Sequence, residues 1–425
     1  MRGVRRRRVV AAGAAAALLG RAPTVRAQAA APRVLVIGGG YAGATAAKYL
    51  RLFSTRRLEV VLVEPEAAFV SCPMSNHVLA GTRNVADLTL PYETLERAHG
   101  VQRVRDRVVR LDAARREAVL ASGTRIAYAK AVLAPGVDMV WDEIAGLRQA
   151  HDEGRVLHAW HAGDETARLR RQLLAMPDGG TFAIAIPETP FRCPPAPYER
   201  ACLVAEWMRE AKPRAKLLVL DANEEPASEA PLFREAWAAR HAGRVDYRPQ
   251  HKATGVDGAA GVIRFEIQDD VRADVLNVLP PMRAGAIAVD AGLANANGRW
   301  CQVDYLTFES TVASDVHVLG DAIQNAPAMP KSGHMANSQA KVAAAAIVAR
   351  LAGTAVDPSP MLTNTCYSFV DAERAAHVAS VHAWSEADRT YRVVPGSGGS
   401  SRTPSTVEGL QAWGWARAIW ADTLG

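Results

Sequence analysis

Cysteine is the residue type in this sequence with the widest range of possible chemistry. The chain of 425 residues has five cysteines: Cys72, Cys193, Cys202, Cys301 and Cys366. None of them forms a C-x-x-C pair, so their spacing does not indicate a zinc site and we predict no metal. The number is odd, so at least one thiol is left over if the others pair.

A glycine-rich segment near residue 40 has the pattern of a dinucleotide-binding turn. An apolar strand is predicted at 33–37, a helix at 44–50 and a second strand at 58–63, which ends in Glu64. Between the first strand and the helix the chain reads G-x-G-x-x-G, with Gly38, Gly40 and Gly43. These glycines let the backbone approach a pyrophosphate, and the acid can accept hydrogen bonds from ribose hydroxyls. The alternative is a turn that only tightens a βα unit.

Two later segments favour FAD over NAD. Residues 131–136 form a predicted strand that ends in A-x-G, with Gly136. Residues 311–321, TVASDVHVLGD, form another strand and deliver Asp321 to its end. Three such segments in this order are typical of an FAD site, in which the aspartate contacts the ribityl chain. Each segment taken alone could be a buried strand ending in a turn.

A second α/β segment, from about 150 to 279, lacks the corresponding glycines. After the predicted strand 181–186, residues 187–195 contain four prolines and no glycine. Proline has no N–H, and without glycine the backbone cannot come close to a pyrophosphate. We therefore predict a Rossmann-like domain that does not bind NAD(P).

Three of the cysteines could act together with a flavin. Cys193 lies in the proline-rich turn and Cys366 in the C-terminal segment, so a disulfide between them could exchange electrons with the flavin. A structural disulfide, or two buried thiols, fits the spacing as well. Cys72 has no partner at C-x-x-x-x-C spacing, which excludes a dithiol pair there; it is a covalent tether or an inert thiol.

Several stretches resemble the flavoprotein subunit of flavocytochrome c sulfide dehydrogenase. They are VLVIGGGYAGATAAKYL, FVSCPMSNHVLAG, FRCPPAPYERA, ADVLNVLPPMRAGAIA, TFESTVASDVHVLGDA, MPKSGHMANSQAKVAAAA and NTCYS. The resemblance implies FAD joined covalently to Cys72, a redox disulfide Cys193–Cys366, and electron transfer to a c-type cytochrome partner. Cys202 is an extra thiol without an assigned role, and Pro73 also departs from the family pattern.

Two charged residues in these motifs gain candidate roles. Glu199 becomes a candidate proton acceptor or donor beside the disulfide, or else an acid favoured at a helix N-terminus. Lys331 could stabilise negative charge on the reduced flavin, or be a solvated lysine in a turn.

The fold class we predict is α/β, with two Rossmann-like domains of the glutathione-reductase type and a C-terminal α+β domain. The predicted boundaries are 33–149 with 280–355 for the FAD domain, 150–279 for the second domain and 356–425 for the C-terminal domain. The aromatic-rich end, with Trp413, Trp415 and Trp420, is expected to be a packed helix.

Residues 1–27 resemble an export signal of the twin-arginine type. A basic cluster at 5–8 precedes a short apolar stretch and an A-x-A-like cleavage site, VRA. The formal net charge is +6, but these 27 residues hold seven arginines and no acid, which leaves −1 for the rest. A nucleic-acid partner is therefore not indicated, and no transmembrane segment is predicted.

The resemblance implies a sulfide dehydrogenase that uses cytochrome c as its electron acceptor, and the predicted export signal places it in the periplasm. Two alternatives remain: a sulfide:quinone oxidoreductase at the membrane surface, or a flavin-bearing sulfur-carrier subunit without turnover.

Overall fold

The largest sheet is built around a strand that is apolar along its whole length. In the computed structural model, which describes residues 31–425, β1 (Arg33–Ile37) is buried except at its first residue. A strand that is buried on both faces belongs in the middle of a parallel sheet. Here β1 pairs in parallel with β2 and β9. The sheet has the order β20 (Val303–Asp304), β21 (Glu309–Ser310), β22 (Val316–Val318), β9 (Lys130–Leu133), β1, β2 (Glu59–Val63), β5 (Gln102–Val104).

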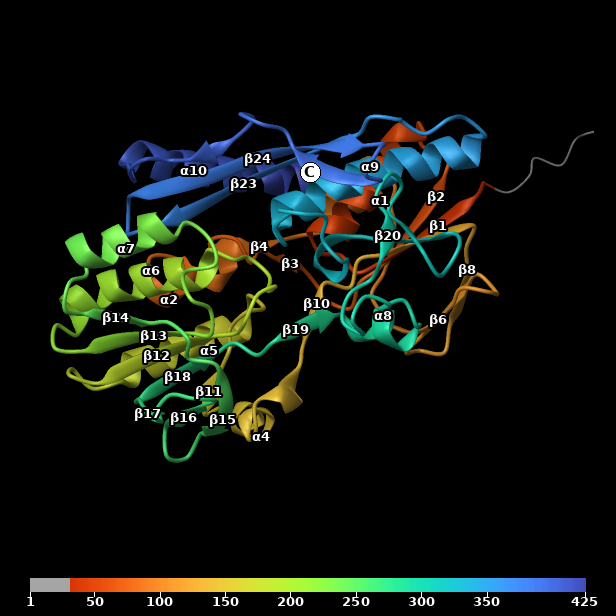
Figure 1. The fold of residues 1–425 in the computed structure, drawn as a ribbon. Coiled ribbons are helices and arrows are strands. Elements are labelled where there is room, and N and C mark those ends of the chain that lie inside the picture. Colours follow the sequence, from red (N-terminus) through yellow and green to blue (C-terminus); the bar gives the residue numbers. More distant parts are fainter. Residues whose placement is uncertain (1–30) are drawn as a thin grey trace, which may run out of the picture. The chain divides into compact units, whose positions relative to one another are not determined.

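Two helices pack against each other beside this sheet. They are α1 (Tyr41–Phe53) and the alanine-rich α9 (Gly333–Ala352). Helix α9 begins at Ser332, whose Oγ accepts a hydrogen bond from the N–H of Met335, and it ends at Gly353 in the left-handed conformation. A short antiparallel pair, β10 (Val137–Met139) with β19 (Met282–Ala284), lies where the chain leaves this sheet and returns to it (Figure 1).

The second sheet is parallel throughout. Its order is β11 (Val156–Leu157), β18 (Val275–Val278), β12 (Thr181–Ile186), β13 (Lys216–Asp221), β14 (Val245–Arg248). The helices of this part of the chain are α4 (Leu147–Asp152), α5 (Asp164–Ala175), α6 (Ala196–Ala211) and α7 (Ala230–Ala239). Its strands fall inside the predicted range 150–279, and those of the first sheet fall inside 33–149 and 280–355.

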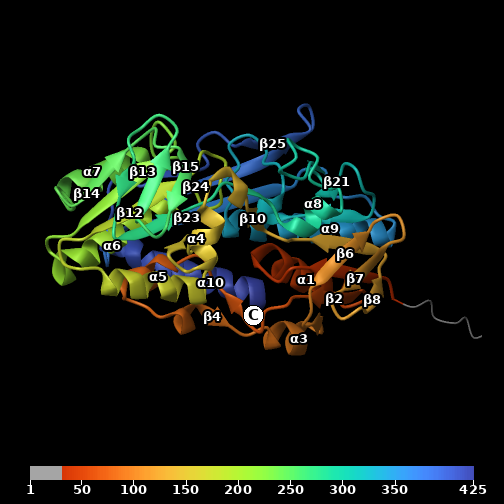
Figure 2. The same cartoon turned by 90° about the horizontal axis from the view of Figure 1, so that it is seen from below.

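The C-terminal segment joins the two halves. Its antiparallel sheet contains β23 (Met361–Phe369), β24 (Ala375–Ser385), β25 (Thr390–Val393) and β26 (Gly399–Ser400). Strand β23 packs against both α9 and α6, and therefore spans the two Rossmann-like halves (Figure 1). The last helix, α10 (Thr406–Leu424), contacts α1 and the strands β23 and β24 (Figure 2). The predicted terminal helix is thus present, with Trp420 buried.

The remaining elements are short. They are β3 (Phe69–Val70), β4 (Thr89–Leu90), β6 (Val108–Asp112), β7 (Glu117–Leu120), β8 (Arg125–Ala127), β15 (Ala253–Asp257), β16 (Val262–Phe265), β17 (Val271–Arg272), α2 (Asn76–Ala80), α3 (Glu93–His99) and α8 (Ala286–Asp290).

The predicted α/β fold with two dinucleotide-binding halves is confirmed. Pro32–Gly425 packs as one compact unit, so the domain boundaries themselves stay a prediction. The export signal predicted for residues 1–27 lies outside the described residues. Within residues 31–425, the helices are too short or too polar to cross a membrane.

Candidate active site

The glycine-rich turn that follows β1 is tightly packed against neighbouring backbone atoms. Gly38 has φ +94°, and a Cβ atom there would lie 2.4 Å from the carbonyl oxygen of Ala134. A Cβ on Gly43 would lie 1.8 Å from the carbonyl oxygen of Gly38, so both positions require glycine. Glu64, at the end of β2, accepts a hydrogen bond from the N–H of Gly39 at 2.5 Å. The turn and the acid therefore form one unit, as the G-x-G-x-x-G pattern predicts.

A cavity of about 1180 Å³ opens from this turn and continues between the two halves to β23. Nine of the eleven residues proposed from the sequence line it: Gly38, Gly40, Glu64, Cys72, Gly136, Cys193, Glu199, Asp321 and Cys366. Gly43 is not among the lining residues, because it packs against the turn itself. A cavity of this size can take a ligand as large as a dinucleotide.

Asp321 provides a test of whether FAD fits this cavity. Its carboxyl is buried, and within residues 31–425 Oδ1 has no hydrogen-bond partner. Burial raises the pKa of Asp321, while Arg192 and Lys331 act in the opposite direction. A buried carboxylate oxygen without a donor suits a ligand that brings a hydroxyl group, as the ribityl chain of FAD does. The residues present fit the cofactor.

Lys331 does not reach the cavity. Its ammonium is buried and donates to the carbonyl oxygens of Asp321 and Ile323 and to Oδ1 of Asn325, and it lies 3.7 Å from the ring centre of Trp300. All three N–H groups are therefore used inside the protein. The interpretation of Lys331 as a flavin-facing charge is not supported by this placement. Instead, its carbonyl oxygen accepts from the N–H of Cys193 at 2.8 Å and so holds that cysteine.

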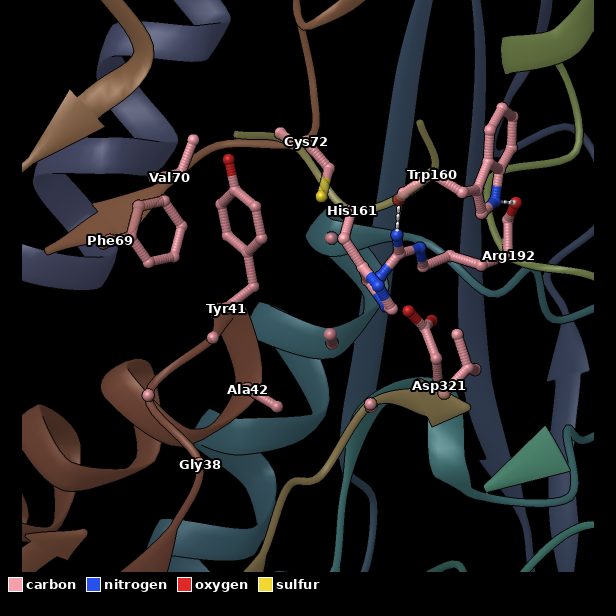
Figure 3. Close-up of a pocket in the computed structure, with 18 of the residues that line it drawn as sticks. Gly38, Tyr41, Ala42, Phe69, Val70, Cys72, Trp160, His161, Arg192 and Asp321 are labelled. Carbon is pink, nitrogen blue, oxygen red and sulfur yellow. Dashed lines mark hydrogen bonds between the residues drawn. The ribbon is translucent and has the colours of Figure 1, made fainter. Parts of the chain in front are cut away.

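Cys72 lies in a turn after β3 that a hydrogen-bonded serine holds in place. Ser71 Oγ donates to the carbonyl oxygen of Pro73 and accepts from Trp420 Nε1 at 3.0 Å. The same Oγ lies 2.8 Å from the hydroxyl of Tyr41. In Figure 3 the Cys72 sulfur points into the space that Tyr41, His161 and Asp321 surround. Cys72 therefore lines the cavity, and its role as a covalent tether stays a proposal.

Arg192 connects the proline-rich turn to the loop after β11. Its guanidinium donates to the carbonyl oxygen of Trp160, and the indole Nε1 of Trp160 donates to the carbonyl oxygen of Arg192 at 3.1 Å (Figure 3). The turn therefore folds onto the neighbouring loop, and its next residue, Cys193, faces the cavity.

Cys193 and Cys366 come to the same cavity from different elements. Cys193 lies in the turn before α6, with φ +57°, and Cys366 lies in β23, where Asn364 Nδ2 donates to its sulfur at 3.6 Å. All five cysteines are free thiols in this structure, so the disulfide stays a proposal. Burial and the neighbouring Cys366 and Glu199 raise the pKa of Cys193 well above its usual value. Cys202 and Cys301 are buried outside the cavity.

Glu199 is held in a fixed orientation at the cavity wall. Its carboxylate accepts from Asn76 Nδ2 at 2.7 Å and from the N–H of Phe369 at 3.1 Å. Burial raises its pKa to about 7. Arg200, which is 1 % exposed, donates to Asn76 Oδ1 at 3.0 Å and thereby orients the amide. A carboxyl with a pKa in this range can take up or release a proton near neutral pH.

The sequence reasoning missed Asn76 and Arg200 as supporting residues. Both lie in the motif stretches, next to residues that were singled out. Their role depends on contacts between residues 124 positions apart, which no local pattern shows.

His151, His158 and Glu165 form a cluster of metal-ligand type within the described residues. The Nδ1 atom of His158 accepts a hydrogen bond from the N–H of Trp160 at 2.9 Å, so the proton of the neutral ring is on Nε2. That Nε2 lies 3.3 Å from a carboxylate oxygen of Glu165. A metal-bound histidine donates from its other nitrogen, and this one accepts there. The cluster is therefore better explained as a hydrogen-bonded network.

The fold and the cavity define a flavoprotein of the class with two dinucleotide-binding halves. Residues 166–280 match the family described as the central part of the flavoprotein chain of sulfide dehydrogenase (flavocytochrome c), and residues 358–424 match the flavin-binding family of flavocytochrome c sulfide dehydrogenase. Residues 32–172 match the pyridine nucleotide-disulfide oxidoreductases. The chain belongs to the family of flavoprotein chains of flavocytochrome c sulfide dehydrogenase, which confirms the resemblance found in the sequence.

The chain is similar to one flavoprotein chain of sulfide dehydrogenase and to sulfide:quinone oxidoreductases. The flavoprotein chain of sulfide dehydrogenase from Chlorobaculum thiosulfatiphilum is 56% identical over 46 residues, which are 11% of this chain and 94% of that sequence. Mitochondrial sulfide:quinone oxidoreductase from Dictyostelium discoideum is 23% identical over 296 residues, 68% of this chain; the match spans 65% of that protein's length. The structure of sulfide:quinone oxidoreductase from Aquifex aeolicus has a TM-score of 0.76 at 18% identity, with 92% of each chain covered, and shows the shared fold.

Proposed function

We propose that this protein is a sulfide dehydrogenase that oxidises hydrogen sulfide through a Cys193–Cys366 disulfide beside FAD. The observation that carries the proposal is the convergence of three groups on one cavity: two cysteines from distant segments, a buried carboxyl with a raised pKa, and an FAD cradle. Each group alone has a structural explanation. Their meeting in one cavity, in a chain of this family, favours sulfide as the substrate.

The chemistry assigned to the protein's own groups is thiol–disulfide exchange. HS⁻ attacks one sulfur of the disulfide; a new S–S bond forms as the old one breaks, which gives a persulfide and a thiolate. Glu199, which lines the same cavity, would accept the proton of the persulfide. FAD, when bound, supplies a two-electron acceptor that can pass electrons singly to a haem. The sulfur product is elemental sulfur or polysulfide.

The finer assignments rest on the sequence motifs, on residues 1–27 and on the family's known properties. Gly38, Gly40, Gly43, Glu64, Gly136 and Asp321 would hold FAD, and Cys72 would bind it covalently. The electron acceptor would be a c-type cytochrome subunit. The site of action would be the periplasm, reached by twin-arginine export.

A sulfide:quinone oxidoreductase is the second candidate. It is favoured by the relatives of that name and by the shared fold. Anaerobic addition of sulfide to the purified holoprotein should bleach the flavin. Subsequent addition of cytochrome c should restore the colour at a rate that a short-chain quinone does not reach. Faster recovery with the quinone would favour the second candidate, and a flavin that sulfide does not bleach would contradict both.

Glu199 should set the lower limit of the pH range. Its carboxyl must be ionised to accept a proton, and burial raises its pKa to about 7, so the bleaching rate should fall as the pH drops below that value. In Glu199→Gln the rate should be lower by about 100-fold, and this acid limb should be lost. Stopped-flow bleaching between pH 5.5 and 9 measures both effects.

Glu210→Gln, on the exposed face of the same helix, is the matched control and should behave as the wild type. Hydrogen sulfide also ionises in the neutral range. If the bleaching rate of Glu199→Gln still falls at low pH as in the wild type, the fall is due to protonation of sulfide. Glu199 is then not the base.

NADH should not reduce the flavin. The turn 187–195 has no glycine, so a pyrophosphate cannot approach the backbone before α6. Anaerobic mixing with excess NADH should leave the flavin spectrum oxidised for minutes, whereas sulfide bleaches the same sample. Rapid bleaching by NADH would mean that this turn does not exclude a nicotinamide cofactor.

A further inference from the structure

A second buried carboxyl lies behind the wall of the cavity. Glu229 precedes α7, with φ +54°, and its Oε2 accepts a hydrogen bond from Ser368 Oγ at 2.7 Å. Ser368 is fully buried in β23 and, like Cys366, lines the cavity. Residues i and i+2 of a strand share a face, so Ser368 and Cys366 point the same way. One hydroxyl therefore connects Glu229 to the side of β23 that carries the cysteine.

Glu229 is not fully satisfied by its hydrogen bonds. Its Oε1 is buried and has no partner within residues 31–425. Burial raises the pKa of Glu229 to about 7; Glu199 on α6 and Glu408 on α10 act in the same direction, and the Ser368 hydroxyl opposes them. This group can therefore hold a proton or release it near neutral pH, unlike a surface glutamate.

Glu199 and Glu229 affect the pKa values of the two cysteines differently. Burial raises the pKa of the Cys366 thiol to about 11, and among the charged neighbours Glu229 contributes more than Glu199. The pKa of Cys193 responds to Glu199, to the two other cysteines of the cavity and to Arg192. The pKa of Cys366 therefore responds most to Glu229 among the carboxyls, and the pKa of Cys193 responds to Glu199.

We propose that Glu229 is a positioning residue that stores and returns a proton for Cys366 through the Ser368 hydroxyl, while Glu199 serves Cys193. This inference rests on the proposed function. When HS⁻ attacks Cys193, the S–S bond breaks and Cys366 leaves with the electron pair. Protonated Glu229 gives its proton to the Ser368 oxygen, the Ser368 hydroxyl turns from Glu229 toward the cavity, and its own proton passes through a cavity water to the Cys366 sulfur. The negative charge then lies on the Glu229 carboxylate, and the reverse transfer restores the thiolate.

The alternative is that Glu229 only fastens α7 to β23. The alkylation rates of the two thiols, measured without sulfide, distinguish a proton-storing role of Glu229 from a structural one. The full-length holoprotein is reduced anaerobically, and Cys366 and Cys193 are alkylated with iodoacetamide at pH 8.5 and quantified separately by peptide mass spectrometry. The variants are Glu229→Gln, Glu199→Gln and, as the control, Glu224→Gln, an exposed residue of the same loop. Glutamine keeps the shape of the side chain and a group that can bond Ser368.

In Glu229→Gln the thiol pKa of Cys366 should fall by about one unit, because a nearby negative charge is removed. A lower pKa gives about tenfold more thiolate, but each thiolate is less nucleophilic. The alkylation rate at Cys366 should therefore rise about threefold. Cys193 should be unchanged, and Glu199→Gln should show the larger effect at Cys193. An unchanged Cys366, or an equal rise at both cysteines as expected from loosened packing, overturns the proposal.

Sulfide-driven bleaching of the same proteins completes the test. In Glu229→Gln, bleaching should be about tenfold slower, with the acid limb from Glu199 retained. A wild-type protein that sulfide does not bleach would refute the proposed function. In that case a selective rise at Cys366 in Glu229→Gln would still support the pairing of these two residues.

Discussion

Replacing either Cys193 or Cys366 with serine should slow sulfide-driven flavin reduction by about a thousandfold or more while the flavin stays bound. Removing a nucleophile or a leaving group from a unit that acts together has effects of this order. The disulfide offers an electrophilic sulfur and a leaving thiolate in one group, and a serine hydroxyl offers neither. Anaerobic stopped-flow mixing with sulfide measures the loss, and the spectrum of the resting variants verifies that the cofactor is present.

A structural disulfide predicts a different pattern. It would close a loop of more than 100 residues, and its loss would cost about 5 kcal/mol in the chain-entropy account. The melting temperature of both variants would then fall by several degrees while bleaching continued. Cys202→Ser is the matched control, because Cys202 is buried on α6 outside the cavity. Near-normal bleaching in Cys193→Ser and Cys366→Ser would end the disulfide mechanism.

The parts of the fold that the sequence predicted are those encoded locally. The strand 181–186 was expected from the sequence, and the structure has it with the same bounds. The turn at Gly38 follows from the absence of a Cβ, a property of the residue itself. The three segments typical of an FAD site meet at one edge of the first sheet, and five of their proposed residues line the cavity: Gly38, Gly40, Glu64, Gly136 and Asp321.

The residues that sequence reasoning misplaced or missed depend on burial and on contacts that no local pattern shows. For Lys331 the sequence left two possibilities, a charge facing the flavin or a solvated lysine in a turn; in the structure its ammonium is buried and donates to two carbonyl oxygens and to Asn325. Glu229 lies in a polar stretch, EEPASEA, that has no motif. Its partner Ser368 is 139 positions away, and only the packing of β23 against the second half brings them together. Burial, which sets the pKa of such groups, cannot be read from a polar segment of sequence.

Replacing Cys72 with serine should turn a covalently held flavin into one that denaturation releases. In the wild type, after precipitation with acid, the yellow chromophore should remain with the polypeptide, because a thioether to Cys72 survives unfolding. In Cys72→Ser all of the flavin should appear in the supernatant. The native variant should still bind FAD, since Glu64, Asp321 and the glycine turn belong to other elements of the cavity. Absorbance of pellet and supernatant, with the mass of the intact chain, measures the outcome.

Cys366→Ser provides the matched control, because it also removes one cavity-lining thiol and should leave the flavin attached. The position of Cys72 makes the prediction specific. Ser71 holds this turn by hydrogen bonds with Tyr41, Trp420 and Pro73, and Cys72 next to it lines the cavity. Cys193 and Cys366 line the same cavity, and either could in principle be the tether. If the wild-type supernatant carries the FAD, or if Cys72→Ser keeps it in the pellet, Cys72 is not the site of attachment, and the redox role of Cys193 and Cys366 must be judged without a tethered flavin.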